Sequence, residues 1–169
     1  MLKEAQTMRK AAWIVLMMVA VAVATAQTIT GVSGFGAAGP ADSTRPDSFF
    51  AISIAQYSYR DQTRTVGGMF LTHYDGAQFH KLALTQVTEF TANVENGTAT
   101  FSGRGYYVTF TRNGGYTRTA GTIVASVSDN DPDTLEVAFY PAGSQEPTFT
   151  YSGEVKQGDI RVYSRSRSR

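Results

Sequence analysis

Cysteine is absent from the 169-residue chain, histidine occurs only twice, and the single tryptophan lies in the first 26 residues. Without cysteine the chain can form no disulfide, thiolate nucleophile, thiolate metal site or lipidated thiol. Motifs of catalysis are also missing: the sequence has no G-x-S-x-G serine and no phosphate-binding loop. We therefore expect no enzymatic activity and no cofactor, and a fold that depends on its hydrophobic core alone.

The N-terminal 26 residues form a separate compositional block. Lys3, Arg9 and Lys10 precede an uncharged apolar run that ends in the small residues Ala24-Thr25-Ala26. This order is typical of a secretory signal peptide, with a signal-peptide helix and cleavage before Gln27. The alternative is an uncleaved anchor, although the run is shorter than the roughly 20 apolar residues of a spanning helix. The pattern predicts an exported protein that is periplasmic, on the cell surface or extracellular.

Removal of this leader leaves 143 residues, enough for one domain with one core. The leader holds three of the 15 basic residues and one of the 14 acidic ones, which leaves 12 and 13 and a net charge of −1. With no overall basic character we expect no nucleic-acid partner, and membrane contact only through the leader before cleavage.

Alternation of apolar and polar residues, interrupted by turn residues, predicts an all-β domain over residues 49–163. We expect about eight antiparallel strands in a meander that forms a small barrel or a sandwich. Residues 27–48, rich in Gly, Ala, Ser and Thr, read as a flexible lead-in, and residues 164–169 as a disordered basic tail.

Three glycine-bearing turns, at Asp75-Gly76, Asn96-Gly97 and Asn113-Gly114-Gly115, set the expected register. A three-residue first loop pairs Val66 with Leu84 and Phe70 with His80, a two-residue second loop pairs Ala92 with Phe101, and a third loop with Gly115 left-handed pairs Phe101 with Val127. The strand over residues 78–94 is far longer than a typical strand, which has about five or six residues. We therefore predict a bulge or bend at residues 86–88, with Gly103 and Gly105 serving a similar corner.

Several turn and core segments resemble a family of small exported bacterial β-domains, which occur alone or at the ends of surface proteins. The segments are Val66-x-Gly68-x-Phe70, Asn96-Gly97-Thr98-Ala99-Thr100-Phe101-x-Gly103, Gly115-Tyr116, Val127-x-Asp129, Asp133-Thr134 and Gly158-Asp159-Ile160-x-Val162. The resemblance covers residues 49–163 and implies a bacterial, non-cytoplasmic, non-enzymatic domain with no catalytic residues to carry over.

Few residues are candidates for a metal or an acid–base site. The expected register puts His80 on the buried face and His73 on the other, so that no shared site results. Asp129, Asp131 and Asp133 alternate as in the first half of a calcium loop, but the expected glycine is Thr134 and the expected glutamate is Tyr140. An ordinary Asp/Asn/Pro loop explains them equally, so that we expect no metal and keep calcium as a weak alternative. Glu89 and Glu136 lie within strands and could meet across a barrel.

The outward face of residues 104–124 is unusually apolar and aromatic. Arg104, Tyr106, Val108 and Phe110 face outward beside Arg118, Ala120, Thr122 and Val124 in the expected register. Either a second layer covers this face, or it is a platform on which sugar rings or a protein partner stack against Tyr106 and Phe110, with Arg104 and Arg118 binding polar groups.

Two functions follow from this sequence. The first is an exported, non-catalytic β-module with a structural or binding role at the cell envelope or surface, its partner an envelope polysaccharide or protein. The alternative is a small barrel that binds an apolar ligand in a cavity lined by Phe70, Leu82 and Phe101, with room provided by glycines 67, 68, 103 and 105.

Overall fold

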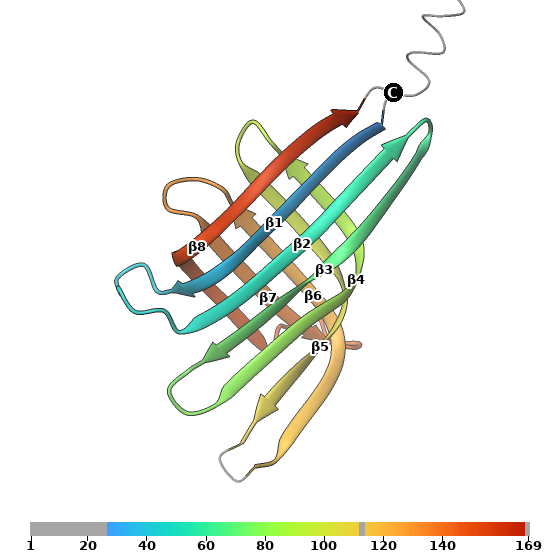
Figure 1. Ribbon diagram of the computed structural model, residues 1–169. Coiled ribbons are helices and arrows are strands. Elements are labelled where there is room, and N and C mark those ends of the chain that lie inside the picture. Colours follow the sequence, from blue (N-terminus) through green and yellow to red (C-terminus); the bar gives the residue numbers. More distant parts are fainter. Residues whose placement is uncertain (1–26, 112–113, 168–169) are drawn as a thin grey trace, which may run out of the picture.

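Eight antiparallel strands form a closed barrel (Figure 1). The structure, a computed structural model, describes residues 27–111 and 114–167; the leader with its expected cleavage site therefore lies outside the described residues. The strands are β1 (Gln27–Gly39), β2 (Ser48–Tyr59), β3 (Gln62–Tyr74), β4 (Phe79–Asn93), β5 (Thr98–Phe110), β6 (Tyr116–Ser128), β7 (Thr134–Pro141) and β8 (Phe149–Arg167). Each pairs with the next and β8 returns to β1, which confirms the all-β meander and selects the barrel. No helix among the described residues has the length and hydrophobicity needed to cross a membrane.

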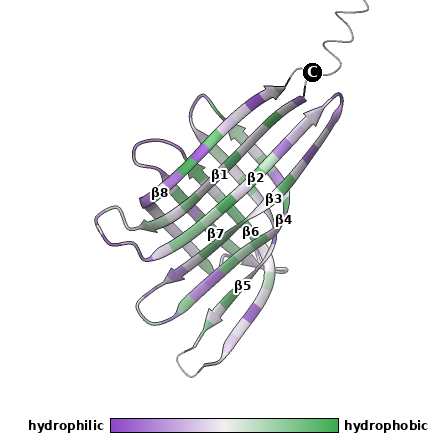
Figure 2. Cartoon of the chain, viewed as in Figure 1, coloured by the Kyte–Doolittle hydropathy of each residue, from purple (hydrophilic) through white to green (hydrophobic). Residues whose placement is uncertain are grey.

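Alternate side chains of each strand fill the inside of the barrel. Apolar and polar residues alternate along the strands, which gives them a striped appearance (Figure 2). The most completely buried large side chains are Phe101, Phe139, Ile54, Leu71, Leu82, Ile123, Leu135, Ile160 and Val32. Eight strands enclose a space that side chains just fill, and here they form one continuous apolar core.

The barrel begins earlier and ends later in the chain than the sequence predicts. Residues 27–39, expected to be an irregular lead-in, form β1, and residues 164–167 of the expected tail extend β8, so that β1 and β8 pair from Gln27↔Arg167 to Gly39↔Glu154. The sequence pattern predicts two short strands at residues 148–155 and 159–163, but residues 149–167 form the single strand β8. The predicted number of eight is therefore correct only because β1 was missed and β8 was counted as two strands.

The predicted bend of the long strand is confirmed. β4 pairs with β5 in three registers, with shifts between Leu84 and Gln86 and again between Val87 and Glu89. Gly103 lies opposite the bend, where a Cβ atom would overlap the carbonyl oxygen of Gln86. Bulges of this kind increase twist, and this one carries β4 away from β3, whose pairing with β4 covers only Met69–Tyr74.

The first hairpin differs from the expected register by three residues, which exchanges its two faces. His73, not Phe70, is opposite His80, and the loop between Tyr74 and Phe79 has four residues. The carboxylate of Asp75 explains this longer loop, because its Oδ1 accepts hydrogen bonds from the backbone N–H groups of Ala77 and Gln78 at 2.8 and 2.7 Å.

The second and third hairpins differ by two residues, which leaves the faces unchanged. Ala92 pairs with Ala99 rather than Phe101, and Val127 pairs with Ala99 as well. In the third turn Gly114, at φ 79°, is the left-handed glycine instead of Gly115; Asn113 lies outside the described residues.

Candidate functional sites: a polar cluster inside the barrel and an aromatic wall outside

The two histidines lie together inside one end of the barrel. Because His73 and His80 are directly opposite on β3 and β4, both side chains point inward and their rings stack with centroids 5.9 Å apart. The expectation that they face opposite sides is therefore wrong, and the four-residue loop at Asp75 is the cause. Phe149, Tyr151 and Tyr107 contact the two rings and close this end of the core.

Hydrogen bonds connect the pair to both neighbouring loops. His80 contacts the Tyr107 hydroxyl through Nδ1 at 2.6 Å and the Asp75 carboxylate through Nε2 at 2.9 Å. On the other side, His73 Nδ1 lies 2.8 Å from Ser48 Oγ. The carboxylate of Asp47 accepts hydrogen bonds from Ser48 Oγ at 3.0 Å and from the Tyr151 hydroxyl at 3.2 Å.

These contacts change the proton affinity of several members, and each change has a physical cause. Burial lowers the pKa of His73, in opposition to the nearby Asp47 carboxylate. The hydrogen bond from His80 lowers the pKa of Asp75 well below its ordinary range. Burial also raises the pKa of Tyr151 to about 12. The cluster is thus held with neutral His73, neutral Tyr151 and ionised Asp75 near pH 7.

Ser48, Asp47 and Tyr151 are the members that sequence reasoning missed. Ser48 next to His73 has the atom types of a nucleophile and its base, but it has no exposed surface and its hydroxyl is engaged by both His73 and Asp47. Across residues 27–111 and 114–167, no group of three or more His, Asp or Glu residues has the geometry to hold a metal ion. The arrangement is that of a closed polar plug, whose hydrogen bonds satisfy groups buried at the barrel end.

The aspartates of the suggested calcium loop bind backbone instead. Asp133 Oδ2 accepts the N–H of Ile160 at 2.8 Å and Asp129 Oδ2 accepts the N–H of Val162 at 2.9 Å, while Asp131 is exposed between them. Burial raises the pKa of Asp133. The pairing of β7 with β8 ends at Glu154, and the two carboxylates bind the backbone of β8 beyond that point. They cover an otherwise open strand edge, which gives this loop a structural role.

The outward-facing residues predicted to form a platform are on the outer wall of β5 and β6. The guanidinium Cζ of Arg118 lies 4.0 Å from the centroid of the Tyr106 ring, and Lys81 Nζ lies 5.1 Å from that of Phe110. Arg104 is exposed on the same face, one outward position along β5 from Tyr106. The structure thus brings Tyr106 and Arg118 into contact and places Arg104 and Phe110 on either side of Tyr106 along β5.

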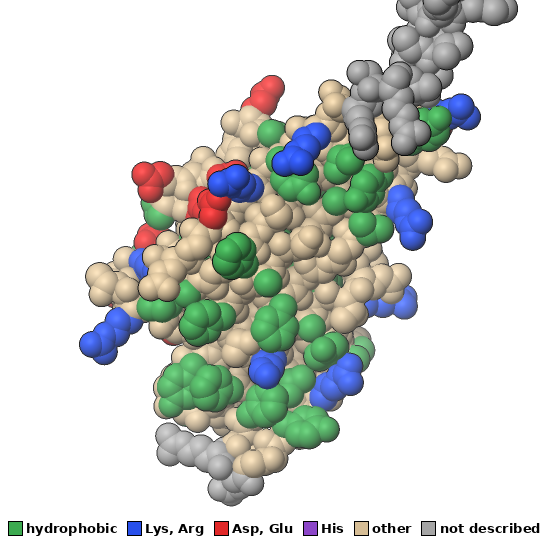
Figure 3. All heavy atoms as spheres, viewed as in Figure 1, with side chains coloured by type: hydrophobic (Ala, Val, Ile, Leu, Met, Phe, Trp, Pro, Cys, Tyr) green, Lys and Arg blue, Asp and Glu red, His purple; other side chains and the backbone are tan. Residues whose placement is uncertain are grey.

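This surface continues over β2, β3 and β4, and the corrected register adds Phe70 to its outward aromatic rings. Phe49, Phe70 and Phe79 expose 65%, 43% and 52% of their surface. Hydrophobic side chains gather over the lower end of β3 and β4 with basic groups among them (Figure 3). We name this surface the aromatic wall; its members are Phe49, Phe70, Tyr74, Phe79, Lys81, Tyr106, Phe110, Tyr116 and Arg118. The correct loop length at Asp75 would have added the β3 members, Phe70 and Tyr74, to the outward face predicted from the sequence.

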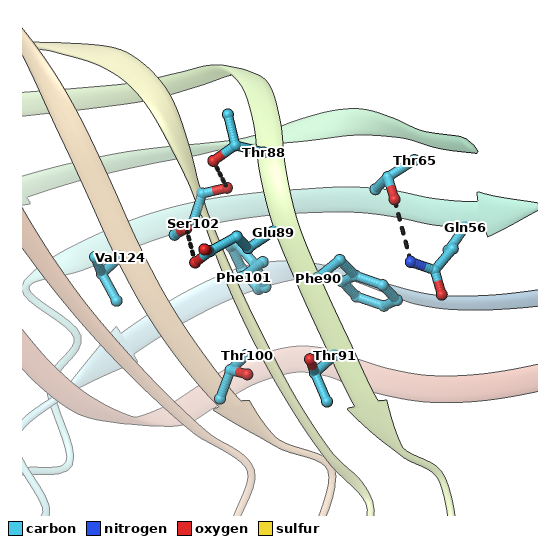
Figure 4. A pocket seen from close by; sticks show the side chains of 10 residues that line it. All are labelled: Gln56, Thr65, Thr88, Glu89, Phe90, Thr91, Thr100, Phe101, Ser102 and Val124. Atoms are coloured by element: carbon cyan, nitrogen blue, oxygen red, sulfur yellow. Dashed lines mark hydrogen bonds between the residues drawn. The ribbon is translucent and has the colours of Figure 1, made fainter. Parts of the chain in front are cut away.

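A cleft of about 570 Å³ opens where β4 leaves β3 (Figure 4). Its lining residues are Gln56, Thr65, Thr88, Glu89, Phe90, Thr91, Thr100, Phe101, Ser102 and Val124. Glu89 accepts a hydrogen bond from Ser102 Oγ at 2.9 Å on the outer face, and Glu136 accepts a separate one from Ser126 at 3.1 Å. The two glutamates therefore do not meet across the interior, since the pairing of their strands turns both outward.

The cavity suggested for an apolar ligand does not have the expected lining. Phe70 lies on the outer wall, while Leu82 and Phe101 are packed within the core. At glycines 67, 68, 103 and 105 a Cβ atom would overlap the carbonyl oxygen of a neighbouring strand. These glycines permit close approach of backbones and do not leave space for a ligand.

Comparison with models of known protein families, with curated proteins and with solved structures gives no match for this chain.

Proposed function

We propose that the protein is an exported, non-catalytic binding module of the bacterial cell envelope or surface, and that its aromatic wall binds an envelope polysaccharide. The observation that carries the proposal is the wall itself. Several of its rings are half or more exposed, among them Phe49 at 65% and Tyr116 at 66%. Isolated apolar side chains are common on surfaces, but a continuous group over five strands is not.

The chemistry of the wall suits sugar rings better than a purely apolar partner. Arg118 over Tyr106 and Lys81 over Phe110 place cationic donors directly beside aromatic faces. A sugar presents apolar C–H faces together with hydroxyl groups, so that rings and donors of this kind satisfy both parts of it.

Export is supported by two features of the sequence. The leader has the charge order of a signal peptide, and it ends in the small residues that a signal peptidase accepts. The resemblance to exported bacterial β-domains supports the same location. N-terminal sequencing of the protein from its host should begin at Gln27; a chain beginning at Met1 would contradict processing.

Retention on insoluble cell-wall polysaccharide tests the binding role. The double variant Tyr106→Ala, Phe110→Ala should lose most of the retention while its melting temperature stays within a few degrees of the unmodified protein. Tyr140→Ala, which removes a ring from the outer face of β7 outside the wall, is the matched control and should bind normally. Unchanged retention of the double variant would dismiss the aromatic wall as the binding surface.

A further inference from the structure

A second surface combines arginine and tyrosine over four strands. It lies on the outside of the barrel, at the end opposite to the aromatic wall. Register aligns Arg165 of β8, Ile29 of β1, Tyr57 of β2 and Arg64 of β3 in one transverse row. Alternation with the buried residues Ile54, Ile160 and Val162 puts this row outside. Strands about 4.8 Å apart separate the two arginine Cα atoms by roughly 14 Å.

The neighbouring rows extend this surface with tyrosine. Tyr163 lies across Gly31, where any Cβ atom would collide with the phenol. Arg165 Cζ is 5.3 Å from the Tyr163 ring centroid, and Arg60 Cζ is 5.1 Å from that of Tyr59. We name this surface the arginine platform; its members are Ile29, Tyr57, Tyr59, Arg60, Arg64, Tyr163 and Arg165. Hydrophobic side chains with basic groups at their border are visible at this end in Figure 3.

The arginines of the platform form no ion pair with any residue that the structure describes. All three, Arg60, Arg64 and Arg165, are exposed. The adjacent Arg161 differs, because its Nε donates to Asp159 Oδ2 at 2.6 Å. Without the leader the chain has a net charge of −1, so the positive charge of the platform is a local feature of the surface. Such a local positive charge favours an anionic partner.

We infer that the arginine platform binds an acidic polysaccharide, a polymer of sugar rings that carry carboxylates. Guanidinium groups bind carboxylates through paired hydrogen bonds, and the ring of Tyr57 between Arg64 and Arg165 contacts the apolar face of a sugar. Spacing across four strands suits an extended polymer with charges on separate residues. The choice of polysaccharide over other polyanions rests on the proposed function as an envelope module.

Affinity electrophoresis through gels that contain polygalacturonate tests this inference. The double variant Arg64→Gln, Arg165→Gln should bind the polymer weaker by about tenfold or more, and binding by the unmodified protein should weaken as salt is raised. Arg161→Gln is the control for loss of an arginine outside the platform; it removes one positive charge, which Asp159 already neutralises, and it should change the affinity little. Equal losses in the double variant and in Arg161→Gln would overturn the platform as a specific site.

Two further gels separate this inference from the proposed function. With a neutral polysaccharide in the gel, the arginine variant should migrate as the unmodified protein does. Retention on cell-wall material that is lost with Tyr106→Ala, Phe110→Ala, combined with unchanged polygalacturonate binding in the arginine variant, would sustain the aromatic wall and refute the platform. With single-stranded DNA in the gel, retention equal to that on polygalacturonate would refute selectivity for acidic sugars.

Discussion

Phe79 and Leu82, three residues apart on β4, provide a direct test of which face of the sheet is buried. Phe79 exposes 52% of its surface on the aromatic wall, whereas Leu82 is fully buried in the core. Truncation of a buried leucine costs about 2–5 kcal/mol, because transfer energy is lost and a cavity remains. Truncation of a half-exposed ring without a cavity should cost about 0.5 kcal/mol or a little more.

These free energies convert to clearly different melting temperatures. An unfolding entropy of about 2.1 cal/mol/K per residue amounts to roughly 0.3 kcal/mol/K for a barrel of this size. Leu82→Ala should therefore lower the melting temperature by about 7–17 °C, and Phe79→Ala by only about 2 °C. Calorimetry or circular dichroism on both purified variants measures the contrast.

The decisive outcome is a large loss of stability in Phe79→Ala. A decrease comparable to that of Leu82→Ala would mean that another layer covers the wall, and would refute the reasoning that makes it a binding surface. A small decrease in Leu82→Ala would instead contradict the assignment of the interior.

Three other predictions concern charges and backbone. Because burial lowers the pKa of His73, the unfolded chain takes up a proton that the folded chain resists, so that stability should fall as pH decreases from about 7 to about 5; the melting temperature of His73→Phe should depend less on pH over this range. An ultraviolet absorbance titration should show one tyrosine that ionises near pH 12, and Tyr151→Phe should abolish it while the other tyrosines titrate as before. Gly67→Ala should lower the free energy of unfolding by more than about 1 kcal/mol in denaturant titration, since φ is 114° and the new Cβ overlaps Ser53. Gly76→Ala, with φ at 91° but open surroundings, should lower it less. Equal losses of stability would contradict the role of the close approach.

Strand alternation was sufficient to predict the fold class and most of the core. Residues such as Phe101, Val127 and Leu135 alternate with polar neighbours, and an even shift in register leaves them on the same face. The bend of β4 was predictable for a similar reason, because a strand of that length could not keep a single apolar face in register.

The glycine-rich composition of β1 concealed it from sequence reasoning. Gly31, Gly34 and Gly36 suggest a flexible segment, yet each lies where a Cβ atom would collide with β2 or β8. Glycine is required there by a neighbouring strand distant in sequence, which local composition does not reveal.

The candidate sites depended on one loop. Asp75 was treated as part of a three-residue turn, but its carboxylate binds two backbone N–H groups and His80, which extends the loop to four residues. That single residue reversed the faces of β3, separated the histidines in the prediction, and hid Phe70 from the aromatic wall. Side-chain hydrogen bonds that select between two loop lengths are beyond pattern reasoning.

Closure of the barrel between its first and last strands also determines how the molecule would respond to force. Gln27 and Arg167 are paired at the same end of β1 and β8, so that tension applied to these two residues acts across the strands. Hydrogen bonds of an antiparallel pair would then load one after another, as in the opening of a zipper, and not all together in shear. Pulled apart at Gln27 and Arg167, the barrel should therefore open at low force, starting at the β1–β8 junction.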